Sequence, residues 1–227
     1  MILITGDTHG LIDYNKIERL NKINVLSNND YLIIAGDFGG IWNARTLDHD
    51  LSFYTKLPFK ILFVDGNHEN FDLLNGYPIS TWNGGKVHII KDNIIHLIRG
   101  QVFEIEGKTI FTFGGGTSID KYRRTEHISW WKEEIPSEEE ICEAKENLKF
   151  FNNRVDFVVT HSIDSKTLEN PKLFVYGNKC EAFEDNYILD WFEDNVIYNH
   201  WYFGHYHIDE SITDKKTALY NNIIELK

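Results

Sequence analysis

Cysteine, proline and methionine are scarce in this sequence, with two, four and one respectively in 227 residues. Two cysteines are too few for the disulfide framework of a small secreted domain, so reduced thiols are expected. No apolar run reaches the roughly 20 residues that a membrane-spanning helix needs. The first residues lack the basic segment of a signal peptide. We therefore expect a cytoplasmic protein that does not associate with membranes.

Basic residues are outnumbered, with 23 lysines and arginines against 35 acids and a formal net charge of −12 at pH 7. A protein that follows the phosphates of a long nucleic acid needs a basic stripe, so such a partner is not expected. A small site whose charge is reversed by bound metal remains possible. Aromatic residues make up 14%, which predicts a large core. Length and the absence of repeats or linkers predict a single domain over residues 1–227.

Three apolar runs in the first third of the chain have the pattern of buried parallel strands, and each ends in a glycine-led polar loop. These runs are residues 1–5, 31–35 and 60–65. A helical period of apolar residues predicts a helix between the first two, through Ile12, Ile17, Leu20 and Ile23. Residues 44–57 are a second candidate helix. The strands recur about every 30 residues, as in βαβ units, so their loops should meet at one sheet edge.

The middle of the chain changes to a pattern of antiparallel strands, at residues 87–90, 94–98 and 101–116. The last of these should contain a hairpin turn near Glu106-Gly107. An irregular insertion is expected at about 117–136. Ser137 and Glu140 then form a capping box that begins a helix. A further strand is predicted at 155–161, a short helix at 184–195, a strand followed by a turn at 200–207, and closing strands at the C-terminal end.

Five polar loops, each at the end of a predicted strand, carry the chemistry of the sequence. They read GDTHG (6–10), GDFGG (36–40), GNHE (66–69), TH (160–161) and GHYH (204–207). They bring together two carboxylates, one amide and four imidazoles: Asp7, Asp37, Asn67, His9, His161, His205 and His207. Such ligands suit divalent Mn, Fe, Co, Ni or Zn. Seven exceed the need of one ion and suit a pair that shares a bridging carboxylate.

The spacing of His205 and His207 raises a separate expectation. Alternation along a strand would direct both imidazoles to the same face.

These five motifs in this order resemble those of the calcineurin-like metallophosphoesterases, whose pattern runs GDxH, GDxx, GNH[D/E], H and GHxH. The match spans residues 6–207. The resemblance implies an α/β fold, a four-layer α-β-β-α sandwich of two mixed sheets flanked by helices. It also implies two divalent ions, with Mn favoured over Fe, Zn, Co or Ni.

The resemblance divides the ligands into two sets and a bridge. The first ion would be held by Asp7, His9 and His207, the second by Asn67, His161 and His205, and Asp37 would bridge them. Two neighbouring cations would supply a bridging hydroxide near neutral pH for in-line attack on phosphorus. They would also offset the charge of the transition state. Beside the catalytic Asp37, His68 would lie off the metals as the candidate general acid at the leaving group.

The second loop departs from the pattern of the Ser/Thr protein phosphatase branch, which reads GDxxDRG. Here it reads GDFGGIW, with Gly40 and Ile41 in place of the aspartate and arginine. That aspartate orients the catalytic histidine, and Asp65 and Glu69 are the acids that could replace it. A phosphoprotein phosphatase is therefore the alternative function, followed by a non-catalytic metal-binding scaffold.

The insertion carries a basic cluster in an otherwise acidic chain. Arg123 and Arg124 are candidates to bind a substrate phosphate, and solvated surface charge is the alternative. Trp42, just after GDFGG, is the candidate pocket wall. The cluster and the missing DRG element favour a nucleotide or another small phosphoester as substrate.

Two tryptophans of the insertion, Trp130 and Trp131, could stack on a base. Packing against the domain is the favoured interpretation, because aromatic residues are usually buried.

Overall fold

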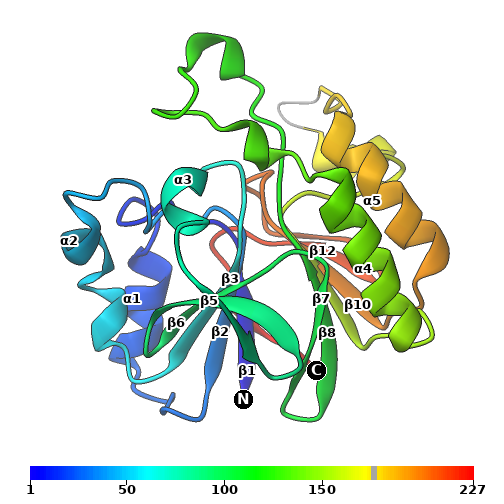
Figure 1. The fold of residues 1–227 in the computed structure, drawn as a ribbon. Helices are drawn as coiled ribbons and strands as arrows, with labels where there is room; N and C mark the ends of the chain where they lie inside the picture. Colours follow the sequence, from blue (N-terminus) through cyan, green and yellow to red (C-terminus); the bar gives the residue numbers. More distant parts are fainter. Residues whose placement is uncertain (175–177) are drawn as a thin grey trace.

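A computed structural model describes residues 1–174 and 178–227. Two mixed β-sheets pack face to face, and helices cover the outer face of each (Figure 1). The fold is therefore the predicted four-layer α-β-β-α sandwich.

The first sheet has seven strands in the order β13-β1-β2-β3-β6-β5-β4. Four central strands run parallel: β1 (Ile2–Thr5), β2 (Tyr31–Ala35), β3 (Lys60–Val64) and β6 (Ile94–Leu97). The antiparallel strands are β5 (Gly85–Lys91), β4 (Ile79–Trp82) and β13 (Ile224–Glu225). The three N-terminal strand predictions are confirmed to within one residue, because strands buried on both faces read as continuous apolar runs.

The second sheet has six strands in the order β11-β12-β10-β9-β8-β7. The strands are β7 (Gln101–Ile105), β8 (Lys108–Phe113), β9 (Phe157–Thr160), β10 (His200–Phe203), β11 (Glu210–Thr213) and β12 (Lys216–Ala218). Between β7 and β8, Glu106 and Gly107 have φ angles of 51° and 72°. A two-residue hairpin turn of type I′ requires a positive φ at both of its residues. The predicted turn is confirmed.

Three apolar clusters fill the spaces between the four layers. Ile4, Leu62 and Val159 belong to the cluster between the sheets. The outer face of the first sheet is covered by α1 (Asn15–Lys22) and α2 (Leu47–Leu51), and that of the second by α4 (Glu138–Phe150) and α5 (Glu184–Asn195). The remaining helices are α3 (Phe71–Leu74) and short 3₁₀ helices at Tyr54–Lys56, Lys121–Arg123, Lys132–Glu134, Thr167–Glu169 and Pro171–Leu173. None of the described helices is long and apolar enough to cross a membrane.

Two helix predictions were too long. α1 begins only at Asn15, and Ile12 and Ile23 are 75% and 64% exposed. The chain after GDTHG first turns back on itself, with the amide of Asp13 donating to the carbonyl of Thr8 at 2.9 Å. Residues 44–57 form only α2 and a 3₁₀ turn. The capping box of Ser137 and Glu140 at α4 is confirmed.

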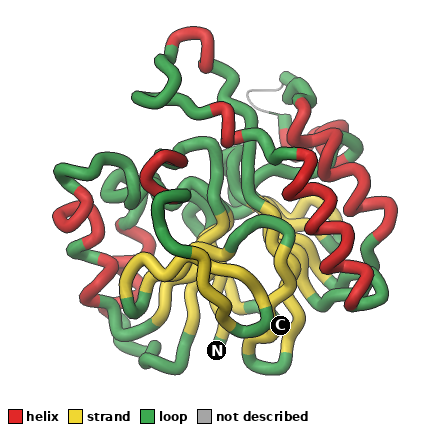
Figure 2. The backbone as a smooth tube through the Cα atoms, viewed as in Figure 1, coloured by secondary structure: helices red, strands yellow, loops and turns green. Residues whose placement is uncertain are grey.

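The carboxyl ends of the parallel strands of both sheets lie at one edge of the sandwich, where loops gather (Figure 2). Both chain termini lie at the opposite edge (Figure 1). Residues 117–136, here called the 117–136 segment, rise above the loop-bearing edge (Figure 1). The fold thus places five polar loops and this segment on the same side.

Candidate metal centre

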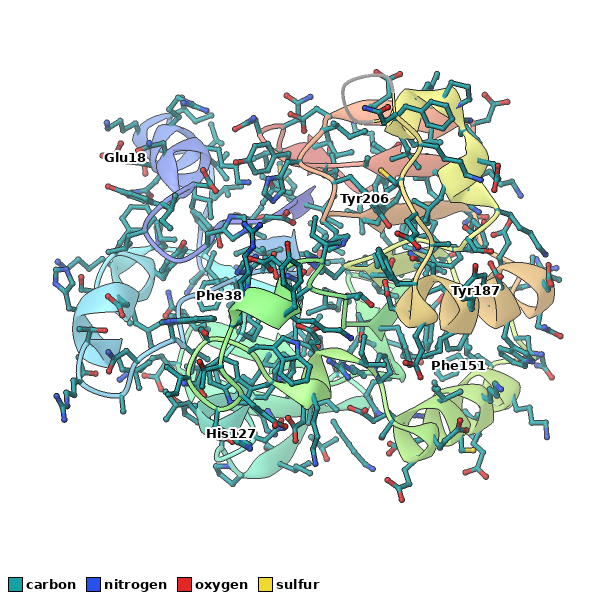
Figure 3. All side chains as sticks on the ribbon, turned by 90° about the horizontal axis from the view of Figure 1, so that it is seen from above. Glu18, Phe38, His127, Phe151, Tyr187 and Tyr206 are labelled. Carbon is teal, nitrogen blue, oxygen red and sulfur yellow. The ribbon has the colours of Figure 1, made fainter. Side chains whose placement is uncertain are left out.

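The loop-bearing edge brings the predicted ligands of both sheets together. Figure 3 looks down on this edge: Phe38, next to Asp37, and Tyr206, between the two C-terminal histidines, lie toward the middle of the molecule. Glu18 of α1 and Tyr187 of α5 lie at its two sides. The centre therefore forms where the two sheets meet.

One ligand set is buried and gathers around His161. The Nδ1–H of His161 donates to the carbonyl of Ala35 at 3.0 Å, which directs Nε2 away from it. Nε2 lies 3.1 Å from Asn67 Oδ1, 3.3 Å from Asp37 Oδ1 and 3.2 Å from His205 Nδ1. A carboxylate and an amide oxygen have no proton to share, so these atoms surround a position that suits a cation.

The electrostatics of His161 lead to the same conclusion. Burial alone would lower the pKa of its imidazole, but the carboxylates of Asp37 and Asp7 outweigh burial and raise the pKa to about 10. Without a metal ion, the carboxylates around His161 favour the protonated imidazole. The buried carboxylates therefore require positive charge, which a divalent metal supplies.

The other ligand set is more exposed and contains Asp7, His9 and His207. Each offers a donor atom, and the three atoms lie within 4.8 Å of one another. Asp7 Oδ1 accepts from the amide of His205 at 3.1 Å. Among the described residues, its buried Oδ2 accepts no hydrogen bond of good geometry, although His207 Nε2 lies 3.0 Å away. A buried carboxylate oxygen without a donor fits a metal ligand.

Asp37 lies between the two sets. Its Oδ1 faces His161, and its Oδ2 lies 3.3 Å from His9 Nε2. The amide of His68 donates to Oδ1 at 2.7 Å and fixes the carboxylate. Burial acts to raise the pKa of Asp37, but His161 outweighs it and holds the pKa well below its usual range. One carboxylate thus faces both ligand sets, which is the arrangement that a bridging ligand needs.

Four of the seven candidate ligands have left-handed backbones, with φ of 45° at His9, 48° at Asp37, 67° at His205 and 52° at His207. The expectation that His205 and His207 share a strand face was wrong, since β10 ends at Phe203 and both lie in the following turn. The turn directs His205 to His161 and His207 to Asp7. Such conformations cost on the order of 1–3 kcal/mol each and cluster at functional sites.

Two glycines allow the loops to approach the carboxylates. A Cβ on Gly66 would lie 2.1 Å from Asp37 Oδ1, and one on Gly204 would lie 2.2 Å from Asp7 Oδ1. A side chain at either position would displace a ligand. The leading glycine of these two motifs is therefore a requirement of space.

His68 lies beside His9 and Asp37, and the three together form a group of donor atoms that could hold an ion, so its place off the metals stays a prediction. Its ring packs edge-on against that of His9 with centroids 5.2 Å apart, and its donor atom lies within 4.8 Å of those of His9 and Asp37. Burial lowers the pKa of His68, and Arg124 acts in the same direction.

Asp65 and Glu69 were the acids proposed to orient His68, and among the described residues neither side chain forms a hydrogen bond with His68. Asp65 binds Arg99 and His96, and Glu69 accepts from the amide of Gly39.

Sequence reasoning missed the partners that support the exposed set. Asp13 Oδ2 lies 2.7 Å from His9 Nδ1 and leaves Nε2 free to face the site. Tyr220 stacks on His207 with ring centroids 4.5 Å apart. The buried amine of Lys16 donates to the carbonyls of Gly6, Asp7 and Tyr220. No sequence signal identifies these residues, because the chain turns and the C-terminal loop bring them together.

The substrate-binding candidates differ in position. Arg123 is exposed, whereas the side chain of Arg124 is 17% exposed and held by Asp120 at 2.8 Å. Trp42 packs against the core and lines a cavity of about 300 Å³ together with Asn43, Asn70 and His127. Arg124 is therefore the better placed of the two arginines, and the cavity beside Trp42 is lined by none of the seven candidate ligands.

The favoured packing role is confirmed for Trp131, whose side chain is buried. Its indole N–H donates to Asp72 Oδ2 at 2.8 Å, and its ring packs on Trp42 with centroids 5.4 Å apart. His127 also contacts Asp72, at 3.0 Å. These contacts fix the 117–136 segment to α3.

A comparison with the models of known protein families agrees with this geometry. The model of the calcineurin-like phosphoesterase family matches residues 1–209. The chain belongs to this family. A calcineurin-like phosphoesterase uses divalent metal ions, and two groups of donor atoms could each hold an ion here: Asp7, His9 and His207, and His9, Asp37 and His68.

Two solved structures resemble this calcineurin-like phosphoesterase at low identity. Protein AQ665 of unknown function from Aquifex aeolicus is 17% identical, with 87% of each chain covered and a TM-score of 0.38. The phosphopantetheinyl hydrolase PptH from Mycobacterium tuberculosis is 15% identical, with 96% of this chain and 87% of that chain covered and a TM-score of 0.44. A search of the curated proteins gives no match.

Proposed function

We propose that this calcineurin-like phosphoesterase uses two divalent metal ions, Mn favoured, to hydrolyse a nucleotide or another small phosphoester. The position of Asp37 carries the proposal, because one carboxylate faces both ligand sets. Two ions held there would activate water for attack on phosphorus and offset the charge of the phosphoryl group. A cytoplasmic location stays a prediction from the composition.

The protein residues around these ions would bind and orient the ester. His68 lies next to the bridging carboxylate and would donate a proton to the leaving oxygen, or a hydrogen bond to it. Its pKa is lowered by burial and by Arg124. The negative charge of a bound phosphate would oppose both effects and favour the protonated imidazole.

Residues of the 117–136 segment and of the loop after β2 would bind the ester. Arg124 would bind a phosphate oxygen, since Asp120 holds its guanidinium near His68. The cavity beside Trp42 would receive the apolar part of the leaving group. The overall negative charge favours such a small substrate over a long nucleic acid. A phosphoprotein phosphatase is less well supported, because neither Asp65 nor Glu69 orients His68.

The first test is turnover of p-nitrophenyl phosphate and bis(p-nitrophenyl) phosphate by protein loaded with Mn²⁺. Asp37→Asn should lower kcat by about 100- to 1,000-fold, as the removal of charge stabilisation does in other enzymes. Asp48→Asn is the matched control, because the side chain of Asp48 is 93% exposed on α2. Preference for the monoester would indicate a phosphatase, and preference for the diester a phosphodiesterase. Failure of the protein to bind any metal would contradict the proposal.

A further inference from the structure

A residue of the 117–136 segment contacts a candidate metal ligand directly. The amide Nδ2 of Asn67 donates to Ser118 Oγ at 3.1 Å, and both side chains are buried. The other end of the same amide, Oδ1, faces His161 Nε2. Among the described residues, Ser118 is the one partner that holds the nitrogen end of this amide and turns its oxygen toward the buried set.

Ser118 is itself held in place by the neck of the segment, here defined as residues 116–118 together with Glu134. Its amide donates to Glu134 Oε1 at 2.9 Å, and the amide of Gly116 donates to the carbonyl of Glu134 at 3.0 Å. Glu134 is fully buried. Thr117 donates to Asp185 of α5 at 2.5 Å. The backbone that carries the Ser118 hydroxyl is therefore held by Glu134 on one element and by Asp185 on another.

The neck of the segment also lies against the buried ligand set. A Cβ on Gly116 would lie 2.9 Å from His161 Cδ2, 3.4 Å from Asn67 Oδ1 and 3.6 Å from His205 Cε1. The far end of the segment is anchored through Trp131 and Asp72. The segment is thus attached at both ends, and its neck covers the ligands of one ion.

We propose that Ser118 is a positioning residue for the second metal ion, and that the 117–136 segment thereby sets the affinity of the buried ligand set. The inference rests on the proposed two-ion function. An amide ligand that loses its partner can rotate and direct its NH₂ group at the cation, which opposes binding. Outer partners of metal ligands typically contribute 10- to 100-fold in affinity, and we expect a loss of this size for Ser118→Ala.

The test is a Mn²⁺ titration of metal-free protein, followed by calorimetry and by electron paramagnetic resonance, neither of which depends on turnover. Wild type should bind two ions with a spin-coupled spectrum. Ser118→Ala should weaken one ion about 10- to 100-fold and give an isolated Mn²⁺ spectrum at intermediate concentrations. Ser118→Thr, which keeps the hydroxyl, should restore the coupled pair.

The matched control is Ser129→Ala in the same segment, where the hydroxyl accepts from the amide of Thr125. This change should leave both affinities as in wild type. Equal affinities in wild type and Ser118→Ala, or the same loss in Ser129→Ala, would overturn the role of Ser118. A wild type that binds a single ion would contradict the proposed function, and Ser118 would then be judged by whether its loss weakens that ion.

Discussion

The two ligand sets of the candidate centre differ in their access to water. The side chain of His161 is fully buried, whereas that of His207 is 47% exposed. The buried set lies beneath the neck of the 117–136 segment, and the exposed set borders solvent. Closed metal sites typically retain their ion, and open ones leave a position for water or substrate. We therefore expect tight binding in the buried set and ready exchange in the exposed one.

The supports behind the two sets differ as well. Behind the buried set, Asp65 precedes the GNHE loop and is paired with Arg99 at 2.5 Å, with both side chains buried. Behind the exposed set, Lys16 meets backbone carbonyls, and burial lowers the pKa of its amine to about 8. A charge pair supports one set, and a single cation with neutral acceptors supports the other.

The largest effect is expected for Arg99→Met. It would take the guanidinium away from the buried carboxylate of Asp65 and leave the His96 imidazole at 3.2 Å. Breaking a buried ion pair typically costs 3–5 kcal/mol of the free energy of unfolding. Urea denaturation at pH 7 would measure this, with the exposed Arg123→Met as the control.

The same ion pair predicts a pH dependence. Burial acts to raise the pKa of Asp65, but Arg99 and His96 together outweigh it and hold the pKa below its usual range. Because the folded pKa lies below the unfolded value of about 3.9, the pair's stabilisation is present above that pH. It is lost as the pH falls further. Melting temperatures between pH 3 and 7 should fall more steeply in wild type than in Arg99→Met, and parallel curves would contradict the assignment.

The next largest effect is a loss of metal affinity that distinguishes the two ligand sets. His161→Ala should abolish binding of the buried ion, a loss greater than the roughly 100-fold expected for an outer partner. His207→Ala should weaken only the exposed ion, and added imidazole should restore it, because that position is open to solvent. Mn²⁺ titration with and without imidazole tests both. Rescue of His161→Ala by imidazole would contradict the claim that the buried set is closed to solvent.

A smaller effect is expected for Asp13→Asn. An asparagine can no longer hold the Nδ1–H of His9 with a charged oxygen, so we expect about 10-fold weaker binding of the exposed ion. The buried ion should keep its affinity. Asp50→Asn, at an exposed acid of α2 that pairs with Thr46, is the control. Equal loss at both ions would show that the two sets are not independent.

The smallest effect concerns the backbone. At His207, φ is 52°, so metal-free His207→Gly should be about 1 kcal/mol more stable than His207→Ala. His200, in strand β10, is the control position, where alanine should be the more stable variant. Urea denaturation of the four variants without metal checks this. The same order at both positions would contradict backbone strain at His207.

Local features were the most predictable from sequence. The strands ending at Thr5, Ala35 and Val64 show long apolar runs, and their glycine-led loops identify the sheet edge. The hairpin at Glu106 and the capping box at Ser137 depend on a few adjacent residues. Strand β4 was missed although Asn83-Gly84 is a strong turn signal, because its exposed edge carries few apolar residues.

The sequence alone determined which residue types lie at the carboxyl ends of the strands, since local periodicity sets the strands and glycines set the turns. Only the tertiary structure decided their partners. Ser118 meets Asn67, Asp13 meets His9 and Tyr220 stacks on His207 because distant loops converge where two sheets meet. The tertiary structure also determines that His161 is buried and that His207 is exposed. Burial depends on what packs above a residue, which no local pattern records.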